Sequence, residues 1–421
     1  MRLIFLNRYF HPDHSATSQM LSGLAFFLAG TGHQVRVITS RQRYEDAAAQ
    51  LPEQEHINGV DLYRVRTTSF GRAHLAGRAV DYLSFYVMAG WQLWRLARAD
   101  DVIVAKTDPP LIAVIAALIA RLRRARLVNW VQDLFPEVAQ ALGLRLLGGP
   151  QAAPLRWLRW LRRLRWLRWL RWLRNWALHA AVANVVLGER MAAVVARSGV
   201  PAGNICVIPN WADGDAIYPV APADNRLRRD WGLEGKCAVC YSGNLGRAHE
   251  FNTILDAAQR LAGRSPEIVF LFIGGGAQRA AVEHAVSSRA LPNVQFRPYQ
   301  QQAELSQSLS AGDIHLVSQR PEVEGYVFPS KLYGILAAGR PLVFIGAPDG
   351  EIGRLVEREG VGVAVRQGDA AGLAEQLVRL AGDAAQRAAI GQRARALLCT
   401  RYDKSIAFKA WQDLLAGLGR F

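Results

Sequence analysis

Residues 320–346 read RPEVEGYVFPSKLYGILAAGRPLVFIG, and this stretch carries the clearest information about the fold. It opens with a loop that contains two glutamates. A helix, KLYGILAAG, follows at 331–339, and an apolar strand, PLVFIG, ends the stretch at 341–346. A further apolar strand, DIHLVSQ, precedes it at 313–319. Two short apolar strands joined through a helix are typical of a βαβ unit in a buried parallel sheet.

The same alternation continues in both directions along the chain. Apolar strands are expected at 2–7, 33–40, 100–106, 126–133, 237–243 and 267–276, with helices at 253–263 and 277–288. The stretch VIPNWADGDAIYP at 207–219 is rich in turn residues and predicts a domain boundary. We therefore expect an α/β protein with domains at 1–206 and 207–400. We expect 401–421 to form a C-terminal helix that returns to the first domain.

Charge is concentrated in the first half of the chain. The net charge is +16 over 421 residues. Residues 1–200 hold 27 basic and 13 acidic residues, so +14, whereas 201–421 hold 24 and 22, so +2. This asymmetry predicts a polyanionic partner for the first half, either a membrane or a nucleic acid. Four cysteines are too few for a disulfide framework.

The most apolar run, PPLIAVIAALIA at 109–120, is too short to span a bilayer, and no secretory signal is evident. We therefore expect a buried helix there, in a cytoplasmic protein that touches a membrane without crossing it.

Two glycine-rich turns of the second half follow strands and precede helices. YSGNLGRAHEF at 241–251 contains Gly243, Asn244, Arg247 and His249, and FIGGG at 272–276 contains Gly274. Glycines let backbone amides approach an anion, and a helix N-terminus favours negative charge. Each turn alone is more simply an ordinary βα turn, but two on one sheet edge favour a nucleotide site.

The loop at 320–331 adds side chains suited to a diphosphate. Ser330 is expected at a helix N-cap with Lys331 just inside, and Glu322 and Glu324 precede them. A hydroxyl and an ammonium at a helix end bind phosphate, and a carboxylate holds sugar hydroxyls. The simpler interpretation is a solvated acidic loop before a capped helix. No metal-binding cluster is visible, so we expect protein cations to meet the diphosphate without a metal.

Seven motifs in order make the chain resemble a known family. They are YFHPDHSATSQ, VQDLFPE, VIPNWAD, YSGNLGRAHEF, FIGGG, PSKLYGILAAGRP and GDAAGLAEQLVRLAGDAAQR. The chain resembles the retaining family-4 glycosyltransferases of GT-B fold, within the bacterial subgroup of colanic-acid and O-antigen assembly. The resemblance covers nearly the whole chain except about 150–178. It implies two Rossmann-like domains that face each other across a cleft, with an Arg/Trp/Leu-rich helical insertion in the first.

The resemblance also implies roles for individual residues. Glu324 and Asp133 would be catalytic. The acceptor would be bound by His11, Thr17 and Ser18. The nucleotide-sugar donor would be bound by Gly243, Asn244, Arg247, His249, Gly274, Tyr299, Ser330 and Lys331. The donor is a substrate, so no cofactor is implied. Sugar transfer would retain configuration, with the leaving phosphate assisting the attacking hydroxyl.

One departure from the family pattern concerns a second glutamate. The family commonly places it inside the helix that follows the "EG" pair, which is Glu324–Gly325 here. Alternative alignments put this position at Leu332 or Gly334, and neither is acidic. In the family the second acid usually binds the ribose. We therefore expect nucleotide affinity or base selectivity in this protein to differ from that of the family.

Residues 156–176 form an insertion of unusual composition. Residues 156–174 contain eight Arg, five Trp and six Leu, with no acid. Arginine recurs about every third residue, so it spirals round a helix and leaves no fixed apolar face. Trp and Arg both favour an anionic bilayer surface, although an expanded DNA repeat tolerated in a loop explains the run equally well.

The leading hypothesis is an enzyme that transfers sugar to a lipid-linked saccharide at the inner face of the plasma membrane. The first domain would contact the anionic membrane surface, and nucleic acid is not an expected partner. Three alternatives stay open: a sugar-nucleotide 2-epimerase of the same architecture, a catalytically degenerate scaffold subunit, and a nucleic-acid binder. The last explains only the Arg/Trp run.

Overall fold

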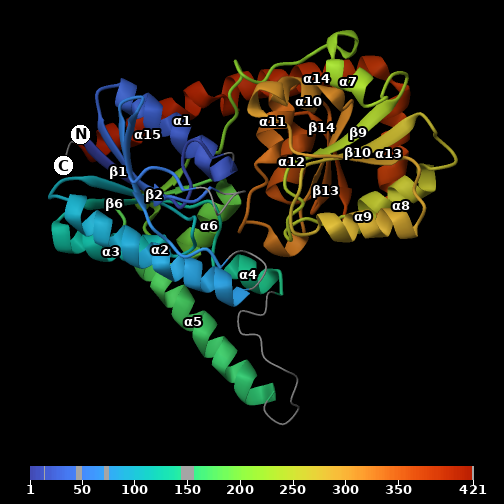
Figure 1. Cartoon of the computed structure of the whole chain (residues 1–421). Helices are drawn as coiled ribbons and strands as arrows, with labels where there is room; N and C mark the ends of the chain where they lie inside the picture. Colours follow the sequence, from blue (N-terminus) through green and yellow to red (C-terminus); the bar gives the residue numbers. More distant parts are fainter. Residues whose placement is uncertain (14, 44–49, 71–74, 144–155, 420–421) are drawn as a thin grey trace. The chain divides into compact units, whose positions relative to one another are not determined.

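The computed structural model describes residues 1–13, 15–43, 50–70, 75–143 and 156–419. The chain forms two compact units, each with its own sheet (Figure 1). Unit 1 comprises residues 1–209, 325–328 and 408–421. Unit 2 comprises residues 210–324 and 329–407. Two α/β units, each built on a largely or wholly parallel sheet, confirm the predicted fold class.

Unit 1 is built on an eight-stranded sheet in the order β3-β4-β2-β1-β5-β6-β7-β8. The strands are β1 (Arg2–Leu6), β2 (Gln34–Ser40), β3 (Gln54–Ile57), β4 (Val60–Val65), β5 (Val102–Lys106), β6 (Arg126–Trp130), β7 (Ala183–Val186) and β8 (Ile205–Val207). All neighbours pair in parallel except β3 and β4, which form an antiparallel hairpin. The central strand β1 is almost wholly buried because helices cover both faces.

Two layers of helices cover this sheet. The helices of unit 1 are α1 (Ala16–Gly30), α2 (Leu75–Leu96), α3 (Ile112–Arg123), α4 (Glu137–Ala141), α5 (Arg156–Ala180), α6 (Glu189–Arg197) and the end of α15 (Lys404–Leu418). The buried sides of α2, α3 and the C-terminal end of α5 share one core cluster with β1 and β5. The second layer includes α1 and α15, where Phe27 stacks on Phe408 and Trp411 packs edge-on against Trp130.

The Arg/Trp run is a continuous helix, and its C-terminal half is built into unit 1. Leu167 and Leu170 are 5% and 6% exposed. Arg174 forms an ion pair with Glu137 of α4 at 2.9 Å, and Arg171 contacts the same carboxylate at 3.2 Å. The predicted insertion is therefore a helix, but its second half is an integral part of the domain.

Two buried asparagines anchor the end of α5 to the sheet. The Asn129 amide donates to the Ala177 carbonyl at 3.1 Å and to Asn184 Oδ1 at 2.8 Å. The Asn184 amide donates to the Leu178 carbonyl at 3.0 Å. The last carbonyls of a helix lack partners within the helix, so these side chains on β6 and β7 satisfy groups that burial would otherwise leave unpaired.

Unit 2 is built on six parallel strands in the order β11-β10-β9-β12-β13-β14. They are β9 (Cys237–Ser242), β10 (Ile268–Ile273), β11 (Val294–Arg297), β12 (Ile314–Ser318), β13 (Leu342–Gly346) and β14 (Gly362–Arg366). Counted from β9, this is the 3-2-1-4-5-6 order of a Rossmann fold. Cys237 and Cys240 are buried free thiols of β9, as expected from their apolar setting.

The connections of unit 2 are mostly helical. They are α7 (Arg226–Asp230), α8 (Asn252–Leu261), α9 (Arg279–Ser288), α10 (Leu305–Ala311), α11 (Lys331–Ala337), α12 (Glu351–Arg358), α13 (Ala370–Gly382) and α14 (Ala384–Leu397). The 320–346 stretch supplies α11 and β13, and the helix begins at Lys331 as predicted.

Replacing Asn184 with Ala should destabilise unit 1, because it removes the side-chain donor to the Leu178 carbonyl and the acceptor of an Asn129 amide N–H. Each unsatisfied buried group costs about 1–3 kcal/mol, which corresponds to a fall of roughly 2–12 °C in the melting temperature of a unit this size. Differential scanning calorimetry measures the change, with Asn252→Ala at the exposed start of α8 as the control. Equal melting of the two variants would show that these asparagines do not anchor α5.

Candidate functional site

The main candidate site of unit 2 lies where its strand order reverses. Connections run from β9 to one side through β10 and β11, and return to the other side through β12. The loops after β9 and β12 therefore meet at the carboxyl ends of adjacent strands. His249 donates to the Ser318 carbonyl, and the Ser318 hydroxyl donates to the Glu250 carbonyl at 2.6 Å. A reversal point of this kind is where open α/β sheets bind ligands.

Lys331 projects its amino group into this meeting point. Nζ donates to the Asn244 carbonyl at 3.0 Å and to His249 Nε2 at 3.1 Å. It also lies 4.8 Å from the centre of the Tyr241 ring. Burial lowers the pKa of Lys331 to about 7. The Lys331 ammonium has three N–H groups, and these contacts engage two of them. The third donates to no acceptor among the described residues.

His249 holds Lys331 from the other side and is itself fixed by the backbone. Its Nδ1–H donates to Ser318, so Nε2 carries the lone pair that accepts from Lys331. Burial, together with the adjacent Lys331 charge, lowers the pKa of His249 to about 3. The ring is consequently neutral at physiological pH and in a single tautomer. It orients the ammonium without adding a second positive charge.

The predicted glycine turns pack backbone against backbone beside Lys331. Gly243 has φ +117°, and a Cβ there would lie 3.1 Å from Lys331 Cε. Gly274 has φ +126°, and its Cβ would lie 2.4 Å from the Gly243 carbonyl oxygen. Neither position accepts a side chain, because φ is positive and the space is filled. Glycine at both sites lets the two turns approach each other.

Tyr299 covers the second glycine turn and stays exposed. Its ring lies 3.1–3.2 Å from where Cβ atoms of Gly274 and Gly275 would be. The side chain is 49% exposed, which makes a flat aromatic surface next to the turn. Arg279 donates to the carbonyls of Gly274 and Arg297, so a cation supports the same backbone from below the ring.

Other predicted donor residues lie close in sequence but are held less firmly. Arg247 and Asn244 are exposed on the first turn, and no hydrogen bond or ion pair joins Arg247 to a described residue. Ser330 precedes α11 as predicted, but its side chain makes no capping bond. Arg320 is a cation that the sequence analysis missed. Its Nε donates to the His249 carbonyl at 3.3 Å, and only the tertiary fold brings it to the site.

Glu324 is turned toward a helix end. Its Oε1 accepts from the backbone amide of Glu351, the first residue of α12, at 2.7 Å. A Cβ at Gly350 would lie 3.0 Å from this carboxylate, so glycine makes room for it. The predicted catalytic residue therefore also caps α12, a role that the loop position alone did not indicate.

The position of the missing second acid is apolar. Leu332 is fully buried on α11, and a Cβ at Gly334 would approach Leu309 at 3.3 Å. The residues of α11, Lys331–Ala337, include no carboxylate.

Unit 1 has a corresponding reversal between β1 and β5. The backbone amide of Arg8, after β1, donates to the Asp108 carbonyl, after β5, at 2.7 Å. The Thr17 hydroxyl donates to Asp108 Oδ2 at 3.1 Å. Ser18 is buried and donates to the Asp13 carbonyl at 3.2 Å. Of the three predicted acceptor residues, Thr17 and Ser18 are thus engaged within unit 1, whereas His11 is exposed and stacks edge-on with Phe26.

A buried lysine that the sequence pattern did not single out lies beneath this loop. Lys106, the last residue of β5, donates from Nζ to the Thr17 carbonyl at 2.9 Å and lies 3.8 Å from the centre of the Trp130 ring. Burial lowers the pKa of Lys106 to about 7, while Asp108 acts in the opposite direction. Burial also raises the pKa of Asp108. The signal available in the sequence was a charged residue ending an apolar strand.

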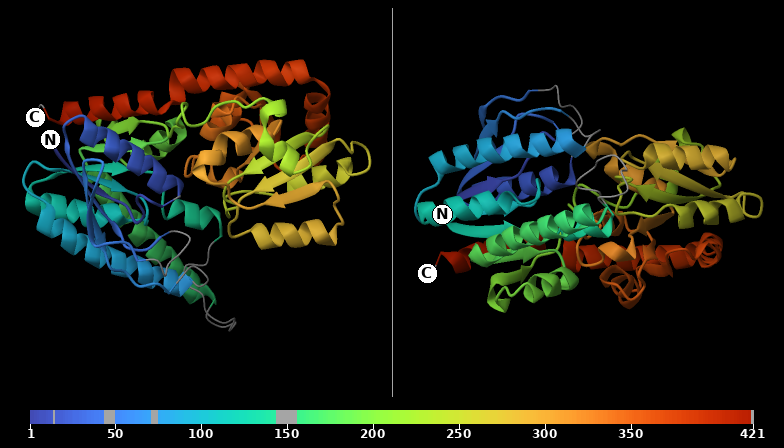
Figure 2. Two further views of the ribbon diagram at one scale, coloured as in Figure 1. Left: turned by 45° about the horizontal axis from the view of Figure 1, so that its top comes forward. Right: turned by 90° about the horizontal axis from the view of Figure 1, so that it is seen from below.

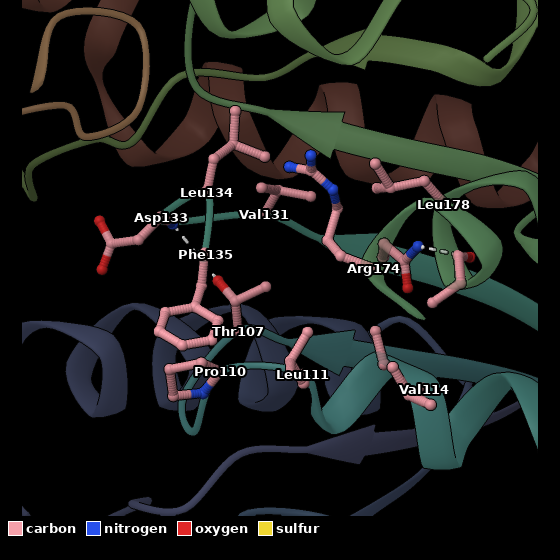
Figure 3. Close-up of a pocket in the computed structure, with 13 residues that line it drawn as sticks. Thr107, Pro110, Leu111, Val114, Val131, Asp133, Leu134, Phe135, Arg174 and Leu178 are labelled. Atoms are coloured by element: carbon pink, nitrogen blue, oxygen red, sulfur yellow. Dashed lines mark hydrogen bonds between the residues drawn. The ribbon is translucent and has the colours of Figure 1, made fainter. Parts of the chain in front are cut away.

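Asp133 lies at the mouth of a pocket in unit 1 (Figure 3). The pocket lies between the ends of β5 and β6, the start of α3 and the end of α5. Its lining is mostly apolar, including Leu111, Val131 and Leu178, with Arg174 among them. The Asp133 carboxylate points away from these side chains. Although it is partly open to solvent, the surrounding protein and then Asp108 raise the pKa of Asp133 to about 6.

Asp133 is further fixed through its backbone. It forms a bridge with Val327, and Leu134 donates to the Tyr326 carbonyl at 2.9 Å. The segment Gly325–Phe328, directly after Glu324, thus belongs to unit 1.

Two negative findings apply to the described part of the chain. No group of three or more His, Cys, Asp or Glu side chains is placed to hold a metal ion there. Within the same residues, no helix combines the length and apolarity needed to cross a bilayer.

Comparisons with known proteins agree with this division. A glycosyl transferase 4-like domain matches residues 16–211, and a glycosyl transferases group 1 domain matches residues 236–383. A putative colanic acid biosynthesis glycosyl transferase, WcaI of Escherichia coli K12, is 29% identical over 87% of this chain and 88% of the relative. A probable glycosyltransferase, WbjE of Pseudomonas aeruginosa, is 26% identical over 63% and 62%.

Solved structures share the fold at low sequence identity. Sucrose-phosphate synthase from Thermosynechococcus elongatus aligns with a TM-score of 0.73 and 17% identity, over 100% of this chain and 99% of that one. Anabaena HepE in complex with UDP aligns with a TM-score of 0.69 and 18% identity, over 99% and 100%. The two matched domains and the shared architecture show that the chain belongs to the GT-B glycosyltransferases, with a 4-like N-terminal domain and a group 1 C-terminal domain.

Proposed function

We propose that the protein transfers a sugar from a nucleotide-diphosphate donor to a lipid-linked saccharide during cell-surface polysaccharide biosynthesis. The observation that carries the proposal is the Lys331 amino group, presented between two glycine turns with one N–H uncommitted among the described residues. The description of WcaI as a putative colanic acid biosynthesis glycosyl transferase and the UDP-glucose complex of HepE support the same reaction class.

The donor diphosphate is expected to replace water at Lys331. The ammonium is held by two neutral acceptors, the Asn244 carbonyl and His249 Nε2, so these contacts do not neutralise its positive charge. Arg247, exposed on the adjacent turn, supplies a second cation. Charge-assisted hydrogen bonds from both are suited to a diphosphate. The exposed ring of Tyr299 and the backbone of Gly274 are proposed to face the base.

Transfer is proposed to proceed with retention of configuration. The acceptor hydroxyl attacks the anomeric carbon as the bond to the diphosphate breaks, and a leaving phosphate oxygen takes the hydroxyl proton. Lys331 and Arg247 stabilise the charge that develops on the leaving group. No side-chain nucleophile is needed, which fits a Glu324 carboxylate already bonded to the amide of Glu351.

The acceptor is assigned to unit 1. The pocket that Asp133 borders is mostly apolar, and the Asp133 carboxylate, which points away from that lining, is suited to accept a hydrogen bond from a saccharide hydroxyl. Thr17 and Ser18 shape the loop after β1, and His11 is an exposed residue of that loop. We place the enzyme in the cytoplasm, peripheral on the inner face of the plasma membrane.

A catalytically degenerate scaffold is the second candidate, because Leu332 and Gly334 replace the usual second acid. A thermal-shift screen against UDP, GDP, dTDP and their sugars tests both candidates. Stabilisation by one of these nucleotides supports the transferase, and no response to any of them favours the scaffold.

Lys331→Ala should weaken nucleotide binding strongly. It removes a charge-assisted contact of about 1.5–3 kcal/mol, so the Kd should rise roughly 10- to 150-fold by calorimetry. Arg247→Ala should act in the same direction. Lys236→Ala is the matched control, since Lys236 precedes β9 at the opposite end of the same strand and donates to the Pro266 carbonyl. Unchanged affinity in both Lys331→Ala and Arg247→Ala would remove the diphosphate from this site.

Donor binding at pH 8 should take up a proton. The free Lys331 has a pKa of about 7 and is mostly neutral at pH 8, whereas a bound diphosphate favours the charged form. Affinity should therefore fall as pH rises above 7, by up to about tenfold per unit. Calorimetry with the responding nucleotide sugar in Tris and in HEPES measures the uptake from the difference in heats. Lys331→Arg stays charged and should show none; equal heats for wild type would contradict the assignment.

Glu324→Gln should separate chemistry from capping. Glutamine keeps an acceptor oxygen for the Glu351 amide, so the melting temperature should stay near that of the wild type. Turnover should fall by roughly 100-fold or more if the charge serves the reaction. Glu324→Ala also removes the cap, worth about 0.5–2 kcal/mol, and should melt lower. Full turnover in Glu324→Gln would restrict this residue to capping and direct the test to Glu322.

A further inference from the structure

Helix α2 carries two apolar stripes, and one of them faces solvent. Its buried stripe, which includes Phe85, Ala89 and Leu93, packs in the core of unit 1. The exposed stripe recurs at helical spacing of three and four residues. Its members are Val80 at 44% exposed, Leu83 at 61%, Val87 at 61%, Trp91 at 60% and Trp94 at 38%. At 100° per residue this stripe lies opposite the buried one, so it lies outside the core of the unit.

The neighbouring helices of the same layer extend this exposed surface. On α3, Leu118 and Leu122 are 50% and 59% exposed. Helix α3 contacts both α2 and α5, and all three cover one face of the sheet (Figures 1 and 2). The Arg123 guanidinium lies 4.1 Å from the centre of the Trp94 ring and joins α3 to α2.

Tryptophans continue the surface along α5. Trp166, Trp169 and Trp172 are 43%, 47% and 60% exposed. Trp166 and Trp169 stack on each other with ring centres 4.9 Å apart. We call the exposed apolar side chains of α2, α3 and α5 together the three-helix surface. So many exposed aromatic and aliphatic side chains on three neighbouring helices indicate an interaction site.

The positive charge of these helices indicates an anionic partner. Helices α2, α3 and α5 contain twelve arginines and one acidic residue. That acid, Asp81, is only 3% exposed and accepts from the Thr68 hydroxyl at 2.8 Å. Arg121, Arg165 and Arg168 are exposed and form no ion pair with a described residue. The surface is therefore apolar and almost purely cationic.

We propose that the three-helix surface binds the interfacial region of an anionic lipid bilayer. Trp and Arg side chains favour the headgroup region, while aliphatic side chains enter the acyl boundary. A second copy of the chain would bring these arginines against one another. A nucleic acid would leave the aliphatic stripe of Leu83, Val87, Leu118 and Leu122 without a partner. The Arg/Trp run that the sequence singled out is thus only part of the contact.

This inference deepens the proposed function by naming the surface that would meet the membrane. The apolar pocket beside Asp133 is lined by Leu111 and Val114 at the start of α3, and by Ala177 and Leu178 of α5. The pocket assigned to the acceptor therefore lies between two helices of this layer. A lipid-linked acceptor would not need to leave the bilayer far to enter it.

Two variants of the full chain test the surface. The first is Leu83→Ser/Val87→Ser/Trp91→Ser on α2, and the second is Arg165→Gln/Arg168→Gln on α5. The matched control is Tyr218→Ser/Val378→Ser/Ile406→Ser, which removes exposed apolar side chains of unit 2. All altered side chains lie on the surface and outside the cores of the two units, so melting temperatures should stay near that of the wild type.

Co-sedimentation with phosphatidylcholine vesicles, with and without 25% phosphatidylglycerol, measures binding. We expect the wild type and the control to bind only the anionic vesicles, and each test variant to bind them roughly tenfold or more weakly. Equal binding by wild type and the α2 variant would overturn the proposal, as would equal binding to both vesicle types. A change from dimer to monomer by light scattering in the α2 variant would assign the surface to a second copy instead.

Nucleotide binding in the same variants keeps the two proposals distinct. Thermal stabilisation by the donor nucleotide should be unaffected, because the altered residues are in unit 1 and the diphosphate loops are in unit 2. Lost vesicle binding with intact nucleotide binding therefore supports the surface. Vesicle binding by a wild-type protein that binds no nucleotide would sink the proposed function alone.

Discussion

Parallel pairing of β9 with β12 is the constraint on which the rest of the candidate donor site depends. In this strand order, the chain leaves β9 at Ser242 and first forms β10 and β11 on one side of it. It then returns to the other side of β9, where β12 begins at Ile314. The loops after both strands are thereby forced together at one edge. The bonds from His249 and Glu250 to Ser318 follow from that adjacency, and Lys331 is delivered to the glycine turn by the helix after β12. The same logic joins Arg8 and Thr17 to Asp108 at the β1–β5 reversal.

The electrostatics at this edge favour an incoming anion. Lys331 is partly desolvated and bonded only to neutral acceptors among the described residues, and His249 is kept uncharged by burial. A lysine in such surroundings loses part of its hydration without gaining a counter-charge, which is why its pKa falls to about 7. The fold maintains this unfavourable state because the packing of the loops determines it. An arrangement of this kind is expected of a binding site more than of a structural ion pair.

Helix α5 has a buried face and an exposed face, although its repetitive sequence does not distinguish them. Leucines of the repeat are buried at 167 and 170, Arg174 pairs with Glu137, and Asn129 and Asn184 hold the final carbonyls. Trp166, Trp169 and Trp172 of the same repeat face outward. A period of three residues on a helix of 3.6 rotates each residue type round the axis, so the repeat has no preferred face of its own. Packing against the neighbouring elements determines which face is buried, and the other face is left to solvent or to a partner.

The sequence alone determined the class of fold, the central strands of both units, several of their helices, the glycine turns and the beginning of α11 at Lys331. These features are encoded locally, in apolar runs of strand length and in residues with special backbone freedom. Tertiary structure decided what depends on long-range contact. It turned Glu324 toward the amide of Glu351, buried Lys106 beneath Thr17, and left the outer stripe of α2 exposed. The pattern of α2 did not distinguish its two apolar stripes, because only packing against the sheet covers one of them and leaves the other to a partner.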